Sequence, residues 1–373
     1  MRCHQPRQRG VSLIELMVGM AIGLLAILVI TQVSLVYEGQ KRTTTSGSDA
    51  QVNGALALQT LLREIQPSGY GLSSGGINGC VEIRGLRNGD AKTRTWIMAP
   101  AVITDPADGT ADSIRVLRSN KTTFSLPQRV YQQHRRDETR FVLDDNINIG
   151  NKVGDLMLAV PPVGSGSWCS LFSISDIPTK TVNGTLQADR YIGHTAGAGT
   201  GQLWNQDLAT SIFPGKLSTD ISYVDGSFLV NLGSFTDRTY SISDKSVLQI
   251  QTFDSSTGIT ADPTELFPNI VNLQAVYGKD TSTPRDNVAD VWNATQPVTA
   301  DDWSRVIALR IAIVARSAQP EKDDVTPNAP TWRPDGITPV SIRVDMNHSS
   351  DWKRYRYKIF ETVVPLRNIL WQS

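Results

Sequence analysis

The sequence has few cysteine and histidine residues, which limits the chemistry that it can support. Its 373 residues include three Cys and four His. The patterns HExxH and CxxC, which mark zinc-binding helices and thiol redox pairs, do not occur. His134, His194 and His348 stand in polar, loop-like segments, where histidines are usually solvated. We therefore predict that the protein is not an enzyme and uses no cofactor.

The sequence also lacks an excess of either charge, with 36 Lys and Arg against 36 Asp and Glu. A nucleic-acid partner is therefore not expected. The segment from Trp352 to Lys358 interleaves aromatic and basic residues, as single-strand nucleic-acid sites do. A strand would place Tyr355, Tyr357 and Ile359 on one face and the basic residues on the other. We interpret the segment as a half-buried strand.

A metal site is weakly indicated at most. The spacing of oxygen ligands in a calcium loop is met by Asp144, Asn146, Asn148 and Asp155. However, Ile149 stands where an EF-hand loop requires Gly. We expect no bound metal.

A long apolar run is the main feature near the start of the chain. It extends from Val11 to Tyr37 and has no polar side chain between Leu16 and Ile30. As a helix, its 27 residues would measure about 40 Å, enough to cross a hydrocarbon core of roughly 30 Å. Basic residues precede the run, so the positive-inside rule keeps the N-terminus in the cytoplasm. We expect a single-pass anchor in a bacterial inner membrane, with the C-terminal domain in the periplasm.

Glu15 is unusual within this run, because a charge inside a membrane costs about 2.5–3.5 kcal/mol and needs a partner. Around it, a basic leader is followed by Gly10, Val11, Ser12 and the apolar tail. This order resembles the signal of type IV prepilins and of type II secretion pseudopilins. The resemblance implies that residues 1–10 form a leader, that prepilin peptidase cuts between Gly10 and Val11, and that Val11 is N-methylated. An unprocessed signal anchor is the alternative.

The helix is predicted to continue beyond its transmembrane half, residues 11–37, into an amphipathic half at residues 38–66. Apolar residues recur there at helical spacing, and these are Val52, Ala55, Leu56, Leu62 and Ile65. Gln59 and Arg63 would point outward, and Pro67 would end the helix. A kinked or loosened middle is suggested by Gly39, Gly47 and Gly54.

Residues 67–373 change to short β-type runs separated by Gly, Asn, Asp and Pro. The predicted strands are 113–117, 140–143, 156–160, 171–174, 221–224, 228–232, 247–253, 271–277, 306–314 and 357–364. We therefore expect an α+β fold, in which a long N-terminal helix precedes a large β-rich globular domain.

Three stretches of this domain resemble the PilW family of minor pilins. They read REIQPSGYGL at 63–72, KVGDLMLAV at 152–160 and RYRYKIFETVVPLRN at 354–368. Two segments, Thr181–Phe213 and Thr281–Trp303, show no such resemblance. The resemblance implies a pilin-type fold for residues 67–373.

Cleavage of the leader would remove Cys3 and leave Cys80 and Cys169. A pair of cysteines in the periplasm favours one disulfide, here between residues 89 positions apart. Two buried thiols are the alternative.

The family resemblance implies a minor pilin that joins other minor and major pilins in a complex that primes pilus polymerisation. We expect Glu15 to pair with the N-terminal ammonium of a neighbouring subunit. Two alternatives remain open, a minor pseudopilin of a type II secretion system and an adhesin carried on the filament.

Overall fold

The structure is a computed structural model that describes most of the chain. The described residues are 10, 12–71, 81–97, 99–106, 108–121, 126–144, 150–162, 164–183, 185–197, 202–205, 212–215, 220–344 and 351–370.

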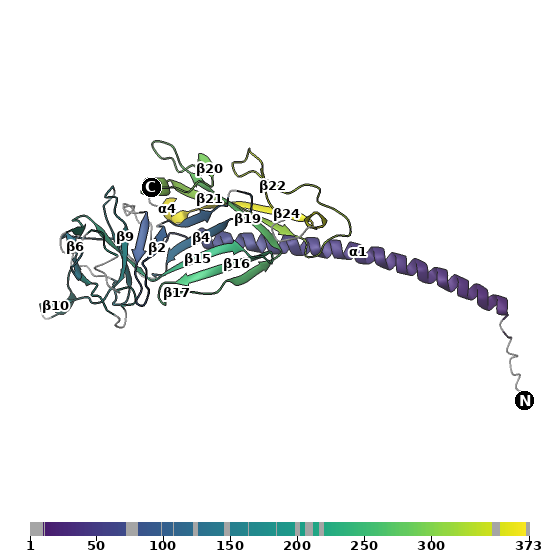
Figure 1. Ribbon diagram of the computed structural model, residues 1–373, viewed down its shortest axis with the longest axis horizontal. Helices are drawn as coiled ribbons and strands as arrows, with labels where there is room; N and C mark the ends of the chain where they lie inside the picture. Colours follow the sequence, from purple (N-terminus) through teal and green to yellow (C-terminus); the bar gives the residue numbers. More distant parts are fainter. Residues whose placement is uncertain are drawn as a thin grey trace, which may run out of the picture.

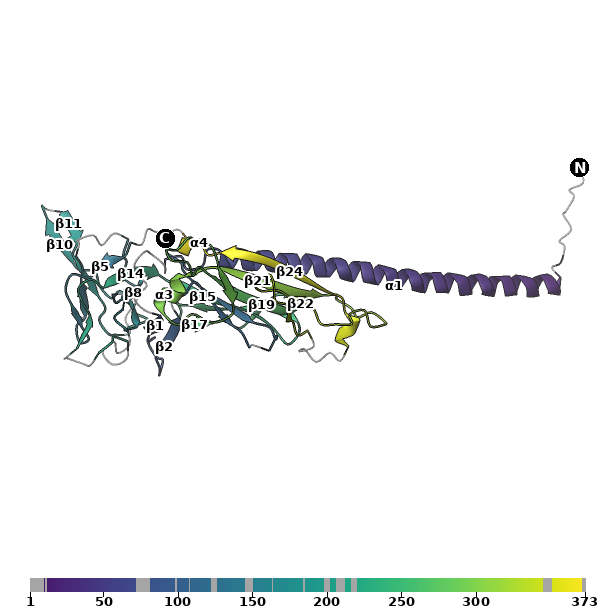
Figure 2. The ribbon, with the colours of Figure 1, turned by 90° about the horizontal axis from the view of Figure 1, so that it is seen from above.

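One long helix, α1 (Leu13–Ile65), extends from a β-rich head (Figure 1). Its 53 residues are continuous, so the three glycines do not interrupt the helix. The segment Leu13–Leu35 has a mean hydropathy of 2.7 and none of it is buried. It is the one described segment long and apolar enough to cross a membrane. The rest of α1 lies along the head, as Figure 2 shows from above.

Two antiparallel sheets form the part of the head that contacts α1. The first has the order β17-β16-β15-β4-β3, with β18 also paired to β16. Its strands are β3 (Ala101–Thr104), β4 (Ser113–Ser119), β15 (Phe235–Ile242), β16 (Val247–Asp254), β17 (Ile259–Thr260) and β18 (Thr264–Pro268). The second has the order β20-β19-β21-β24. Its strands are β19 (Ile270–Lys279), β20 (Val291–Asn293), β21 (Val306–Arg316) and β24 (Tyr357–Pro365).

A third sheet, with the order β2-β1-β9-β8-β14-β5, lies farther from the free end of α1 (Figure 1). Its strands are β1 (Glu82–Gly85), β2 (Arg94–Ile97), β5 (Gln128–Arg129), β8 (Leu156–Val160), β9 (Cys169–Ser173) and β14 (Phe228–Gly233). Strands β1 and β9 are parallel. Two-stranded ribbons complete this distal part: β6 (His134–Arg135) with β13 (Ile221–Tyr223), β7 (Arg140–Val142) with β12 (Tyr191–Gly193), and β10 (Thr179–Val182) with β11 (Thr185–Ala188).

Short elements fill the connections. These are α3 (Ala300–Ser304), the ribbon of β22 (Thr331–Trp332) with β23 (Val340–Ser341), the 3₁₀ turn η1 (Trp352–Arg354) and α4 (Arg367–Leu370). The strand that we predicted around Tyr355 begins only at Tyr357, because η1 occupies the preceding residues. The alternation of aromatic and basic residues there therefore reflects a turn followed by a strand.

Buried side chains divide among several cores. One core joins α1 to the first two sheets, and a second lies between the first and third sheets. A third core, rich in aromatic residues, fills the distal ribbons. The predicted fold class is confirmed, since a long N-terminal helix precedes a β-rich domain with 38% strand and 18% helix. Each of the ten predicted strands overlaps an observed one.

Candidate assembly site on the N-terminal helix

The first turn of α1 is closed by a capping box that involves Glu15. The backbone N–H of Ser12 donates to Glu15 Oε2 at 3.1 Å, and Ser12 Oγ accepts from the backbone N–H of Ile14 at 3.2 Å. These bonds satisfy amide groups that a helix start leaves unpaired, and the carboxylate also favours the positive end of the helix dipole. Glu15 therefore has a partner within its own chain. The Ser-x-x-Glu signature at residues 12–15 could have shown this from the sequence.

The surroundings of the predicted cleavage point are open. No atom of the described residues lies within 4 Å of the position that a Cβ on Gly10 would take. Packing inside the described structure therefore gives no reason for glycine at this position. Val11 lies outside the described residues.

The buried stripe of the outer half of α1 differs from the one that we predicted. Val52 and Leu56 are 53% and 49% exposed, and Ala55 is exposed as well. The buried residues are Ala50, Gly54, Ala57, Leu61 and Ile65. Each of these five is about one helical turn from the next, and three of them are small enough to bring the helix axis close to the sheet. The prediction was right for Ile65, and Leu62 packs against the same core, but it was wrong for Val52, Ala55 and Leu56, because the rest of the buried face is formed by small residues that a pattern of large apolar side chains does not reveal.

Gly54 marks the closest approach of α1 to the head. A Cβ at this position would overlap the ring of Phe360 on β24. By contrast, a Cβ at Gly47 would meet no atom of the described residues. Gly54 therefore serves close packing, and the continuous helix shows no loosened segment there.

Polar contacts fix the end of α1 to the sheets. Glu64 Oε2 lies 2.6 Å from Arg238 Nη1 on β15 and 3.9 Å from Arg118 Nη1 on β4. Since all three side chains are partly shielded from water, the ion pairs are stronger than surface pairs.

The C-terminal end of the chain closes the same junction. The side-chain amide of Asn368 donates to the carbonyls of Pro67 and Ser68, at 2.9 Å each. These carbonyls belong to the turn that follows α1, and next to it Gly69 N–H donates to Leu117 O on β4 at 2.9 Å. Together with the buried stripe, these contacts hold α1 at a fixed orientation on the head. A force on the exposed half of α1 is therefore transmitted to the head.

Two histidines expected at the surface are buried in the distal core. His134 and His194 are each 1% exposed, and their Nε2 atoms are 2.8 Å apart. The His134 ring stacks on Phe141 with 3.9 Å between centroids. Burial lowers the pKa of both rings, that of His194 to about 3. The prediction of solvated histidines was wrong for this pair, and His348 lies outside the described residues.

Of the residues that we considered for metal binding, Asp155 binds other side chains of the protein, and two others lie outside the described residues. Asp155 Oδ2 accepts from Lys121 Nζ and, at 2.9 Å, from Asn231 Nδ2. Asn146 and Asn148 lie outside the described residues. Within the described part of the chain, no group of three or more His, Cys, Asp or Glu side chains could hold a metal ion.

Of the two cysteines predicted to form a disulfide, only Cys169 lies within the described residues. Cys169 is fully buried at the start of β9, and its Cα is paired with that of Ile83 on β1. Cys80 lies outside the described residues, so the disulfide stays a prediction. A GxSxG string occurs at residues 71–75, of which only Gly71 lies within the described part of the chain.

Comparison with known proteins adds two family matches. Residues 237–368 match the family described as Type IV Pilus-assembly protein W, and residues 5–31 match the prokaryotic N-terminal methylation motif. The first match includes residues 281–303, for which the sequence showed no resemblance. No curated protein matches the chain.

Among solved structures, the type IV-like pilin TTHA1219 from Thermus thermophilus aligns over 86% of this chain and 96% of its own chain. The identity is 9% and the TM-score is 0.32. The two sequence matches, at residues 237–368 and 5–31, confirm the resemblance of these parts of the chain to a PilW-family type IV pilin with an N-terminal methylation signal.

Proposed function

We propose that the protein is a minor pilin that acts in type IV pilus assembly, in a complex of minor pilins that primes polymerisation. The observation that carries this proposal is the division of α1. Its first 23 residues are apolar and wholly exposed, whereas its last turns are packed and ion-paired to the head. Such a helix can wait in the inner membrane and then enter a helical bundle of other pilins, while the periplasmic head moves with it.

Glu15 has a specific role in this proposal. After cleavage between Gly10 and Val11, the new N-terminal ammonium of one subunit would meet the Glu15 carboxylate of its neighbour. In an apolar setting each charge is unfavourable alone, so the pairing sets the axial position of one subunit relative to the next. The capping box within the chain competes for the same carboxylate. The effect of the Glu15 charge on assembly must therefore be separated by experiment from its effect on the start of helix α1.

Two substitutions separate them. Glu15→Gln keeps a side-chain oxygen that can accept from Ser12 N–H but removes the charge, whereas Ser12→Ala removes the Oγ acceptor and keeps the charge. We expect Glu15→Gln to reduce co-purification with the other pilins and the number of surface pili by about tenfold or more, a loss typical of breaking a buried ion pair. Ser12→Ala should retain both. Normal assembly of Glu15→Gln, or equal loss in both variants, would contradict the pairing.

Processing can be tested on the same chain. Gly10→Val should block cleavage by prepilin peptidase, because the open surroundings of Gly10 leave recognition by the enzyme as the reason for glycine. Intact mass measurement should show loss of residues 1–10 and gain of one methyl group on Val11 in the wild type only. The same measurement, with and without reductant and alkylation, reports whether Cys80 and Cys169 form the proposed disulfide.

A minor pseudopilin of a type II secretion system is the second candidate, because it would use the same N-terminal helix and the same contact between subunits. The match of residues 237–368 to a pilus-assembly family favours the pilus. Deletion of the gene should abolish pili and leave protein secretion intact, and the reverse phenotype would favour the pseudopilin.

A further inference from the structure

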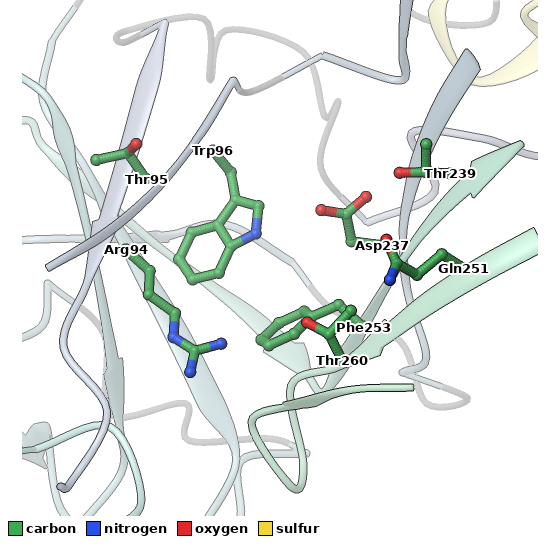
Figure 3. A pocket seen from close by; sticks show the side chains of 8 residues that line it. All are labelled: Arg94, Thr95, Trp96, Asp237, Thr239, Gln251, Phe253 and Thr260. Carbon is green, nitrogen blue, oxygen red and sulfur yellow. The ribbon is translucent and has the colours of Figure 1, made fainter. Parts of the chain in front are cut away.

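A small cavity opens between the first and third sheets, and Figure 3 shows the side chains that line it. Its volume is about 290 Å³, at the lower end of the range for small-molecule sites. One wall comes from β2 and the other from β15, β16 and β17. The lining residues are Arg94, Thr95, Trp96, Asp237, Thr239, Gln251, Phe253 and Thr260.

Strand register brings these residues together. Across the β15–β16 pair, Asp237 is opposite Phe253 and Thr239 is opposite Gln251. Since residues two apart share a face of a strand, all four side chains lie on one side of the sheet. Thr260 is opposite Phe253 on the next strand. The cavity is therefore a consequence of regular pairing rather than of loop conformation.

The cavity has an aromatic floor and a polar rim. Trp96 and Phe253 are buried and belong to an aromatic cluster, with 5.7 Å between their ring centroids. Thr95, Gln251 and Thr260 are exposed at the rim. A few polar groups placed around an apolar base are typical of sites that bind small polar molecules.

Asp237 is the unusual group in this cavity. Asp237 is only 9% exposed, and its buried Oδ1 accepts no hydrogen bond from the described residues. Its ion-pair partner, Arg115 Nε, lies 3.6 Å from Oδ1. A buried carboxylate without donors is unfavourable, so hydroxyl groups from a ligand would stabilise it. In Figure 3 the carboxylate lies on the side of the cavity toward which the Trp96 indole nitrogen is directed.

The charges around the cavity exclude ionic ligands. Arg94 is held by Asp90, with Nε 2.6 Å from Oδ2, and its guanidinium lies 5.4 Å from the Phe253 ring. A cationic ligand would meet Arg94, whereas an anionic one would meet the Asp237 carboxylate. Thr and Gln side chains can both donate and accept hydrogen bonds. This combination suits a neutral molecule with several hydroxyl groups.

We propose that this cavity binds one neutral hexose unit, with its hydroxyl groups on Asp237, Gln251 and the threonines and its carbon ring against Trp96 and Phe253. The inference is independent of the role proposed for α1. A free sugar and the terminal residue of a glycan share this chemistry, and the test distinguishes them.

The test uses the full-length chain in a zwitterionic detergent that has no sugar head group. Glucose, galactose, mannose and N-acetylglucosamine are titrated to about 50 mM while intrinsic tryptophan fluorescence is followed, since Trp96 lines the cavity. At least one should bind saturably, with a dissociation constant on the order of 1 mM. Methyl glycosides are then compared. Equal or tighter binding indicates a glycan terminus, and weaker binding a free sugar with an exposed anomeric hydroxyl.

Matched controls make the result specific. Glucosamine and glucuronate carry a positive and a negative charge on the same ring, and both should bind more weakly than glucose. Gln251→Ala should weaken binding by about fivefold, as expected for a lost hydrogen bond. Gln249→Ala, two residues earlier on β16 and outside the cavity lining, should change it less than about twofold. The proposal is overturned if no neutral hexose binds, if a charged analogue binds more tightly, or if Gln251→Ala has no effect.

Discussion

At the scale of single residues, Asp112 is a carboxyl group buried between two sheets. It is 2% exposed, and its Oδ2 accepts from the backbone N–H of Ala275 on β19 at 2.7 Å. Burial raises the pKa of Asp112 to about 8, although the hydrogen bond from Ala275 opposes the shift and Asp105 adds to it. The folded protein therefore holds a proton there at neutral pH that the unfolded chain releases.

The stability that Asp112 contributes should consequently fall as the pH rises. The folded pKa lies above the unfolded value of 3.8, so the contribution of Asp112 is complete below about pH 4 and is lost progressively up to about pH 8. Asp112→Asn keeps an acceptor for Ala275 N–H and does not titrate. We expect this variant to exceed the wild type by about 1–3 kcal/mol at pH 7, with little difference at pH 4. Denaturant unfolding at both pH values measures the effect, and parallel pH profiles would contradict it.

The N-terminal signal could be recognised from the sequence because it is local, whereas the roles of its single residues stay predictions. Gly10, Ser12 and Glu15 lie within six positions, and the methylation motif that includes them is matched at residues 5–31. The pair of His134 and His194 was missed because its members are 60 positions apart, and each stands beside polar residues. Their burial results from pairing of β6 with β13 and of β7 with β12, which local periodicity does not reveal.

At the scale of elements, the packing of α1 depends on one missing side chain. Gly54→Ala would place a methyl group in the Phe360 ring, so we expect the head to be destabilised by about 1–3 kcal/mol despite the better helix propensity of Ala. Gly47→Ala is the matched control. It lies on the same helix with open space around it and should stabilise by up to about 1 kcal/mol.

Thermal unfolding of both variants in detergent measures this difference. Combining Gly54→Ala with Phe360→Leu should recover part of the lost stability, because leucine lacks the ring atoms with which the new methyl group clashes. Equal melting temperatures for the two glycine variants would show that Phe360 moves aside without penalty.

Strands could be predicted from the sequence where apolar residues dominate. They were missed where polar residues contact helix α1 or line the cavity. Both long core strands, β19 and β21, appear in the sequence as nearly continuous apolar runs. Strand β15 was missed because its Asp237, Arg238 and Thr239 resemble a loop. In the structure Arg238 pairs with Glu64 of α1, while Asp237 and Thr239 line the cavity. The contacts that make these residues suitable for a strand come from other parts of the chain.

At the scale of the whole molecule, the distal part of the head should respond to acid before the part that holds α1. The rings of Phe172, Phe213 and Tyr223 surround the histidine pair, and burial raises the pKa of the Tyr223 phenol. Because both histidine pKa values are lowered below 6.5, stability is complete above that pH and is lost progressively toward pH 3.

We therefore expect the contribution of the histidine pair to fall by about 1–3 kcal/mol between pH 6.5 and pH 4.5, against the opposite contribution of Asp112 over the same range. His194→Gln, which can still bond to His134 Nε2 but does not titrate, should show a clearly shallower decline. Calorimetry at several pH values measures the slope. Hydrogen exchange, corrected for its intrinsic pH dependence, should place the opening in β6, β7 and β12 rather than in β19 and β21. An unchanged slope in His194→Gln would exclude the pair as its source.

The contact of Asn368 with the turn after α1 has a consequence for biogenesis. The ribosome makes α1 before residues 357–368, yet β24 and Asn368 supply part of the surface on which the helix packs. During synthesis α1 can therefore form while this surface still lacks a strand. Closure of the junction requires that the chain has been made as far as Asn368, and a subunit truncated before β24 would carry a helix that is not firmly joined to its head.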